Sequence, residues 1–231
     1  MSQNGPIFLF DVDNTLLDND AVEADLSSYL SREFGAETRD RYWTLFEQLR
    51  GELGYADYLG TLQRYRMENL RDPRVVAMSH FLIDYPFEQR VYPRVFELLR
   101  YARTLGPTVI LSDGDVVFQP WKVRRSGLWD AVDGRVLIYI HKEQMLANVE
   151  ELFPAARYVL VDDKVRILTA VKNVWHDRVV TVFPRQGHYA VPSEVAKYPT
   201  PDVTVERVGD LLEMNPLFTS ATSAPNPPNT D

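Results

Sequence analysis

Residues 7–16, Ile-Phe-Leu-Phe-Asp-Val-Asp-Asn-Thr-Leu, constrain the fold more than any other stretch of the chain. Four apolar residues in a row are typical of a short strand that is buried on both faces. Asp11 and Asp13 follow where that strand should end. Ligands bind at the carboxyl ends of strands in open α/β sheets, and unpaired carboxylates are costly to bury. The stretch therefore predicts a polar site at the end of a buried strand, with a metal as partner of the acids.

Composition and charge exclude several classes of protein. The chain has 231 residues, enough for one large domain or a core with an insert, and its net charge of -8 argues against a nucleic-acid partner. It contains no Cys, which excludes disulfides and thiol chemistry. The first six residues do not resemble a signal peptide, and no apolar run is long enough to span a bilayer. We expect a cytoplasmic protein without a membrane partner, and the oligomeric state stays open.

Residues 18–85 are expected to form a small helical bundle inserted after the first strand. Apolar residues recur at helical spacing in four segments, residues 18–34, 38–53, 55–69 and 75–83, and no strand pattern interrupts them.

After residue 86 the pattern changes to strands and helices in alternation. The expected strands are residues 108–111, 135–140, 158–161, 179–183 and, as a short edge strand, 202–205. The expected helices include residues 143–152, residues 208–214 and a helix that ends before Gly127 with basic residues, Lys122 among them, near its end.

This alternation is typical of a mostly parallel sheet with helices on both faces. The predicted fold class is α/β: a Rossmann-like core of residues 1–17 and 86–214 with the all-helical domain of residues 18–85 inserted. Residues 215–231 are rich in Pro, Ser, Thr and Asn and are expected to be disordered.

Polar residues follow four of the predicted strands, and their order makes the pattern more specific than any one of them. These residues are Asp11 and Asp13, then Ser112, then Lys142, and then the pair Asp162 and Asp163. Because parallel strands end at the same edge of a sheet, all of them belong to one candidate site.

The arrangement resembles the haloacid dehalogenase superfamily of hydrolases from about residue 7 to residue 214. The first motif of that family matches residues 11–15, the second Ser112, the third Lys142 and the fourth the acidic pair. The helical insert resembles the cap that closes over the site in one large subgroup. The resemblance implies a hydrolase that acts on a small phosphorylated metabolite.

The resemblance also implies a role for each acid at the first strand. Asp11 would be the nucleophile that forms an aspartyl-phosphate, and Asp13 would be the general acid and then the general base. Two residues apart on an extended segment, both side chains project to the same side.

The remaining motif residues would bind the phosphoryl group. Ser112 and the backbone N–H groups of Asp113 and Gly114 would hold its oxygens, and Lys142 would neutralise charge on it and on the nucleophile.

Charge counting favours a divalent metal. Asp11, Asp162 and Asp163 bring three negative charges, and Lys142 returns one positive charge. Oxygen ligands of this kind suit Mg²⁺. By resemblance, the backbone C=O of Asp13 is a further ligand, and which of the paired acids ligates the metal directly stays open.

Three alternatives to a phosphatase remain: a phosphomutase, a haloacid dehalogenase or defluorinase, and a non-enzymatic binding protein. Dehalogenases of this family do not keep an acid at the place of Asp13, so its presence favours phosphoryl transfer. A pure binding role has no need of that acid.

Several residues outside the motifs are compatible with substrate binding, although a structural role is the more frequent one. We expect the arginines and aromatic residues of the insert to lie on solvated helix faces or in the bundle core, and His141 to be structural. Residues 185–189, after the fifth strand, either flank the mouth of the site or form an ordinary connection. The insert residues concerned are Arg39, Arg41, Tyr42, Trp43, Arg50, Arg64, Tyr65 and Arg66.

Overall fold

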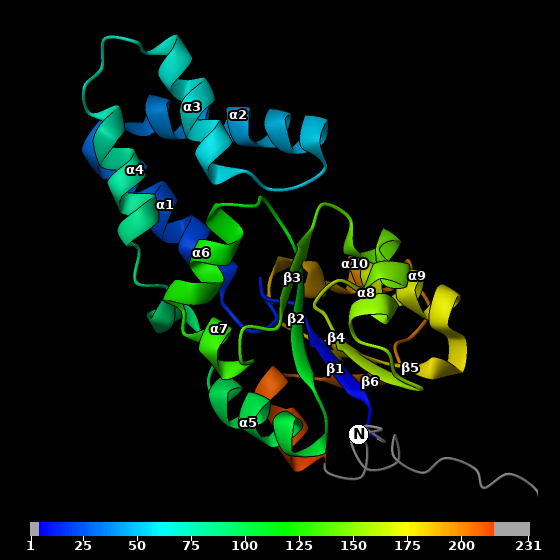
Figure 1. Cartoon of the computed structure of the whole chain (residues 1–231). Coiled ribbons are helices and arrows are strands. Elements are labelled where there is room, and N and C mark those ends of the chain that lie inside the picture. The colour runs from blue at the N-terminus through cyan, green and yellow to red at the C-terminus, as the bar shows by residue number, and fades with distance from the viewer. Residues whose placement is uncertain (1–4, 215–231) are drawn as a thin grey trace, which may run out of the picture.

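The computed structural model describes residues 5–214 and contains a six-stranded, fully parallel sheet with the order β3-β2-β1-β4-β5-β6. The first strand lies at the centre, as Figure 1 shows, with β2 on one side and β4 on the other. The strands are β1 (Ile7–Phe10), β2 (Thr108–Asp113), β3 (Val136–Tyr139), β4 (Tyr158–Val161), β5 (Val179–Pro184) and β6 (Val203–Val205). The predicted α/β class and all six predicted strands are confirmed.

The side chains of β1 alternate between two hydrophobic layers, one on each face of the sheet. Phe8 and Phe10 pack with α5 (Val95–Leu105) and α6 (Phe118–Arg125). Ile7 and Leu9 pack with α8 (Leu146–Leu152) and α9 (Val165–Trp175). Burial on both faces explains why the strand is a continuous apolar run.

Four helices form a bundle that stands over the carboxyl ends of the strands, and we call it the cap (Figure 1). Asp18 caps the first helix, because its side chain accepts a hydrogen bond from the Ala21 N–H at 3.0 Å. Gly54 ends the second with φ of 82°, a left-handed conformation that favours glycine. The helices are α1 (Asn19–Phe34), α2 (Ala36–Leu53), α3 (Tyr58–Glu68) and α4 (Val75–Asp84).

Short helical segments complete the core. The α-helices among them are α7 (Leu128–Ala131) and α10 (Pro192–Val195), and the 3₁₀ segments are η1 (Phe87–Arg90), η2 (Lys142–Gln144), η3 (His176–Arg178), η4 (His188–Ala190) and η5 (Val208–Glu213).

Two predicted helices differ from the structure in type or extent. The closing helix expected at residues 208–214 is the 3₁₀ segment η5, and the helix expected from residue 143 begins with the 3₁₀ turn η2 before α8. Six and three residues are too few for a regular α-helix, and 3₁₀ geometry is common in such short pieces. The tail expected to be disordered, residues 215–231, lies outside the described residues.

Among residues 5–214, no helix is both long enough and apolar enough to cross a membrane.

The central strand should respond strongly to truncation of its core side chains. Leu9 is fully buried between β1 and the α8–α9 layer, so we expect Leu9→Ala to lower the free energy of unfolding by about 2–5 kcal/mol. Urea denaturation measures the change. The control is Leu152→Ala on α8, where the side chain is 51% exposed and the expected loss is below about 0.5 kcal/mol. Equal losses in the two variants would contradict this account of the core.

Candidate active site

Residues far apart in the sequence meet at the carboxyl end of the sheet because β1 pairs with both β2 and β4. Phe10 lies opposite Ile110 on one side and Val161 on the other. The next residue of each segment therefore brings Asp11 beside Asp162. Asp163 and Ser112 lie within the same group of polar side chains.

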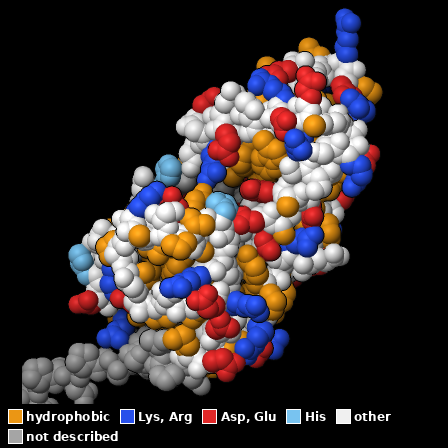
Figure 2. All heavy atoms as spheres, turned by 180° about the vertical axis from the view of Figure 1, so that it is seen from behind, with side chains coloured by type: hydrophobic (Ala, Val, Ile, Leu, Met, Phe, Trp, Pro, Cys, Tyr) orange, Lys and Arg blue, Asp and Glu red, His pale blue; other side chains and the backbone are white. Residues whose placement is uncertain are grey.

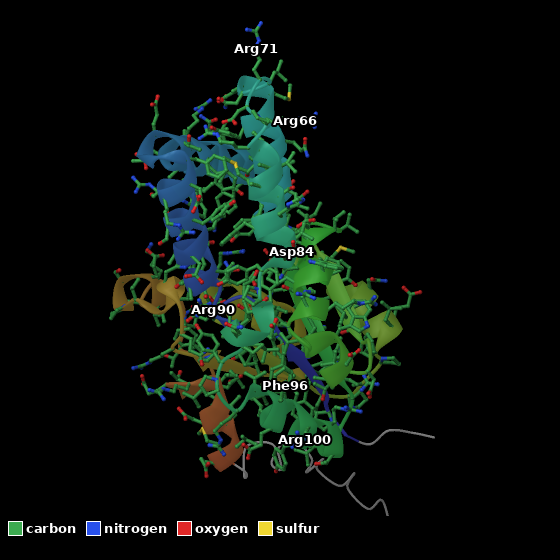
Figure 3. The ribbon with its side chains drawn as sticks, turned by 90° about the vertical axis from the view of Figure 1, so that its left-hand side faces the viewer. Arg66, Arg71, Asp84, Arg90, Phe96 and Arg100 are labelled. Atoms are coloured by element: carbon green, nitrogen blue, oxygen red, sulfur yellow. The ribbon has the colours of Figure 1, made fainter. Side chains whose placement is uncertain are left out.

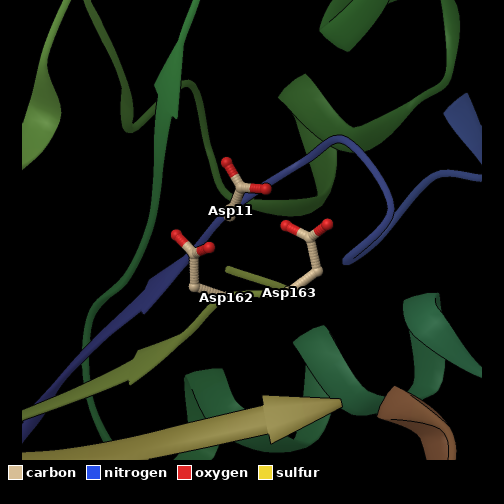
Figure 4. A group of neighbouring side chains, drawn as sticks. All are labelled: Asp11, Asp162 and Asp163. Carbon is tan, nitrogen blue, oxygen red and sulfur yellow. The ribbon is translucent and has the colours of Figure 1, made fainter. Parts of the chain in front are cut away.

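Asp11, Asp162 and Asp163 form a buried cluster of carboxylates. One oxygen from each lies within 4.8 Å of the others, and none of the three residues is more than 3% exposed. Figure 4 shows the three carboxylates facing a common space. The convergence predicted from the strand ends is therefore present in the fold.

Lys142 neutralises two of these acids. Its Nζ donates to Asp11 Oδ1 at 2.5 Å and lies 2.6 Å from Asp162 Oδ2, in an ion pair without hydrogen-bond geometry. Burial alone would lower the pKa of Lys142, but the negative charges of Asp11 and Asp162 outweigh it and raise the pKa. The lysine therefore stays charged and holds the two acids in place.

Asp163 is the acid that remains without a partner. Neither of its carboxylate oxygens has a hydrogen-bond partner among the described residues, although both are buried. Its backbone N–H donates to Thr15 Oγ1 at 2.9 Å, and that hydroxyl donates to Asp11 Oδ2 at 3.3 Å. Thr15 thus fixes the backbone of Asp163 and leaves the carboxylate free to face Asp11.

The unpartnered carboxylate of Asp163 suits a hard divalent cation as its partner. Burial raises the pKa of Asp162 and of Asp163. Repulsion by Asp11 adds to both shifts, and repulsion by Asp162 adds to that of Asp163. A Mg²⁺ ion ligated by oxygen would remove that cost, and the three acids supply the ligand type that it prefers. Because Asp162 is already engaged by Lys142, Asp163 is the better candidate for a direct ligand beside Asp11.

Asp13 lies at the edge of the cluster and is held by two residues to which the sequence analysis gave no functional role, Lys122 and Gln119. Lys122 Nζ donates to Asp13 Oδ1 at 2.6 Å and to Asn19 Oδ1 at 3.1 Å. Gln119 Nε2 donates to Asp13 Oδ2 at 3.2 Å and to Ser112 Oγ at 3.1 Å. Both oxygens of Asp13 are thus held by α6, while its side chain stays 26% exposed.

Lys122 is buried, unlike most basic residues near the end of a helix. The sequence placed it among basic residues at a helix end, which are usually exposed, but it is 1% exposed. Gln119 and Lys122 lie three residues apart, on one face of α6. This spacing indicates a shared face, but the sequence alone does not show that the face is turned towards Asp13.

The predicted phosphoryl-binding residues differ in the contacts that they already make within the protein. Ser112 Oγ donates to Asp11 Oδ1 at 3.4 Å and is buried beside it. The Asp113 carboxylate accepts a hydrogen bond from the Lys142 N–H at 2.7 Å, and burial raises its pKa. The Gly114 N–H donates to the Tyr139 C=O at 2.9 Å, so it is not free for a phosphoryl oxygen as expected. Pairing of β2 with β3 extends to Asp113, two residues beyond the predicted end of the strand.

Most of the basic and aromatic residues of the cap have the structural role expected of them. Arg39, Arg41 and Arg64 form exposed ion pairs with carboxylates on the cap, and Tyr42 and Tyr65 are buried in the bundle. Trp43 Nε1 donates to Ser27 Oγ at 3.1 Å. Figure 3 shows Arg66 near the far end of the cap, together with Arg71, away from the sheet.

A cavity of about 510 Å³ opens between the cap and the core beside Asp13. Figure 2 shows charged side chains of both signs at the waist between these two parts of the molecule. Arg50 is the cap arginine that lines this cavity, and His141 lines it from the core. The imidazole of His141 has no hydrogen-bond partner among residues 5–214. The structural role expected of this residue therefore does not depend on a hydrogen bond from its side chain. Of residues 185–189, Tyr189 lines the cavity.

The comparisons with known proteins agree with this geometry. A family model described as haloacid dehalogenase-like hydrolase matches residues 6–174. A haloacid dehalogenase-like hydrolase from Burkholderia xenovorans LB400 shares 63% sequence identity over 93% of this chain and 98% of its own, with a TM-score of 0.88. No match was found among the curated proteins.

More distant solved structures share the fold. An L-2-haloacid dehalogenase from Xanthobacter autotrophicus is 18% identical, with a TM-score of 0.60 over 91% of this chain and 98% of its own. A hydrolase of the same superfamily from Bacillus subtilis, bound to magnesium, is 16% identical, with a TM-score of 0.59 over the same shares of the two chains.

Removing the unpartnered charge should stabilise the metal-free protein. Since the pKa of Asp163 is raised on folding, the folded state keeps a proton that the unfolded chain loses, and stability falls as the pH rises above about 4. We expect Asp163→Asn to raise the free energy of unfolding at pH 7, without metal, by on the order of 1 kcal/mol and to flatten this fall. Denaturation in EDTA at several pH values measures both effects.

Addition of Mg²⁺ should raise the melting temperature of the native protein and leave that of Asp163→Asn unchanged. The control is Asp177→Asn, an exposed acid on η3, which should keep the native response. A metal-free Asp163→Asn protein that is less stable than the native one, with an intact Mg²⁺ response, would contradict the assignment.

Proposed function

This chain belongs to the haloacid dehalogenase-like hydrolases, and we propose that it is a Mg²⁺-dependent phosphatase that hydrolyses a small phosphate monoester. The observation that carries the proposal is the unpartnered carboxylate of Asp163, buried against Asp11 and Asp162. A reaction centre that works without a metal has no use for this third buried charge, whereas a cation that binds a phosphoryl oxygen requires it.

Asp11 is the proposed nucleophile. One of its oxygens attacks phosphorus, the P–O bond to the leaving group breaks, and an aspartyl-phosphate forms. Lys142 and Thr15 hold its two oxygens, and Ser112 lies beside it to receive a phosphoryl oxygen. Fixed geometry of this kind lowers the entropy cost of the attack.

Asp13 is the proposed general acid and base. It gives a proton to the leaving oxygen in the first step and takes one from water in the second, when that water attacks phosphorus and frees Asp11. Gln119 and Lys122 fix both oxygens of Asp13 at the cavity, where the leaving group must lie.

The metal would be held by Asp11 and Asp163, with Asp162 and the backbone C=O of Asp13 close by. When bound, Mg²⁺ neutralises charge on the phosphoryl group and polarises its P–O bonds.

The proposal is tested with an aryl phosphate as a generic substrate. We expect hydrolysis in the presence of Mg²⁺, reversible loss in EDTA, and loss of at least about 1,000-fold in Asp11→Asn, which lacks the nucleophile. Full activity in EDTA or in Asp11→Asn would remove the proposal. Halide release from a 2-haloacid, measured in parallel, would instead favour a dehalogenase, and a requirement for a sugar bisphosphate would favour a phosphomutase.

The buried lysine next to Asp13 gives a second test. We expect Lys122→Met to lower kcat for the aryl phosphate by about 10–100-fold with little change in KM, because Asp13 loses the contact that orients it. Lys122→Arg keeps a cation there and should restore part of the loss. A correctly folded Lys122→Met protein with native kcat would show that Asp13 needs no such support.

A further inference from the structure

We propose that the leaving group of the substrate carries a second anionic group, a carboxylate or a phosphate, that binds between Arg50 of the cap and Lys164 of the core. This inference rests on the proposed phosphatase function. Its evidence is separate, because it comes from the residues that line the cavity and not from the cluster of Asp11, Asp162 and Asp163.

The cavity has the size of a small-molecule site and walls from two parts of the chain. Its volume of about 510 Å³ lies within the usual range for ligand pockets. The cap contributes Arg50 and residues 54–56, and the core contributes His141, Lys164 and Tyr189. Asp13 lies on the same wall, so a leaving group bound in the cavity extends from the reaction centre towards the cap.

The cap approaches the core closely on one side of this cavity. A Cβ atom built on Gly54 would lie 2.9 Å from the imidazole of His141, which is too close for any other residue without a shift. With φ of 82°, Gly54 turns the chain from α2 into the segment that carries Tyr55. Gly54 and His141 both line the cavity, so the cap and the core lie close together at this point.

Arg50 points towards the core instead of pairing fully with a carboxylate. Its guanidinium donates to the hydroxyl of Tyr189, and its one acidic neighbour within 4 Å among the described residues is Glu47, at 3.6 Å and largely exposed. Arg41 and Arg64 of the same cap, in contrast, make close ion pairs with Glu68 and Glu52. A tyrosine hydroxyl carries no charge, so the guanidinium at the cavity remains largely uncompensated.

Lys164 is the second cation at this wall. Its Nζ lies 5.1 Å from the centre of the Tyr189 ring and has no carboxylate within 4 Å among residues 5–214. Tyr189 therefore has one cation at its hydroxyl and another over its ring face.

Each acid that lines the cavity has a donor for at least one of its oxygens. Glu143 Oε1 accepts from Arg166 at 2.8 Å, while its Oε2 has no hydrogen-bond partner among the described residues. Glu194 pairs with Lys197 at 2.7 Å, Asp113 accepts a backbone N–H, and Asp13 accepts from Lys122. The uncompensated charge at this wall is thus positive. An anionic group on the leaving group would pair with both cations. Charge-assisted contacts of this kind are among the stronger hydrogen bonds.

The test compares two esters that differ in one charge: the phosphate monoester of a short hydroxy acid and the same ester with a carboxamide in place of the carboxylate. For the native protein we expect kcat/KM to be at least about tenfold higher for the acid, mainly through KM. Arg50→Gln should reduce this ratio to about 1–3. Arg64→Gln is the matched control, since this arginine lies on the cap surface, and it should keep the native ratio.

A bisphosphate of similar length, tested beside the two esters, distinguishes a phosphate from a carboxylate as the second anion. Equal kcat/KM for all three compounds in the native protein would overturn the inference while leaving the phosphatase proposal intact. An Arg50→Gln protein that keeps the native ratio would overturn it as well.

If no ester is hydrolysed, the phosphatase proposal fails, and the second-anion site is then tested by the binding of non-hydrolysable analogues. Calorimetry with a phosphonate that bears a carboxylate, and with its carboxamide, should then give at least about tenfold tighter binding of the former, lost in Arg50→Gln. Equal binding of the two phosphonates would overturn the second-anion site independently of catalysis.

Discussion

The pairing of β1 with β4 is the constraint on which the rest of the site depends. It brings Asp11 beside Asp162 and Asp163, three buried carboxylates whose repulsion is relieved in part by Lys142. Lys142 contacts two of these acids, and the third, Asp163, has no hydrogen-bond partner for its carboxylate among the described residues. A buried carboxylate without a hydrogen-bond partner lowers the stability of the fold. Functional sites carry such costs, whereas a purely structural core avoids them.

The cap is coupled to this cluster through Asp13. Asn19, the first residue of α1, accepts a hydrogen bond from the same buried Lys122 that holds Asp13, and it donates to Tyr58 at the start of α3. The side chain proposed as the acid is therefore supported from the core by α6 and from the base of the cap. Arg50 of α2 and Asp13 line the same cavity, so the residue proposed as the acid and the cap arginine face one space.

The sequence predicted the strands and the convergence of their ends because apolar runs, their alternation with helices and the parallel sheet leave little choice of arrangement. It could not choose between Asp162 and Asp163, since that depends on where the amine of Lys142 lies. It placed Lys122 near a helix end and gave it no functional role, because a lysine in that position is usually exposed unless a carboxylate from another element meets it. The Gly114 N–H was expected to be free because the length of β2 was underestimated.

The most direct test of this account is a crystal structure of the protein with Mn²⁺, as a stand-in for Mg²⁺ with anomalous scattering, and with beryllium trifluoride as a phosphoryl mimic. The account predicts one anomalous peak in contact with Asp11 and Asp163, and beryllium bonded to the other oxygen of Asp11 within reach of Ser112 and Lys142. Crystals of the folded protein in which no metal lies between these carboxylates, and in which Asp11 carries no adduct, would contradict it.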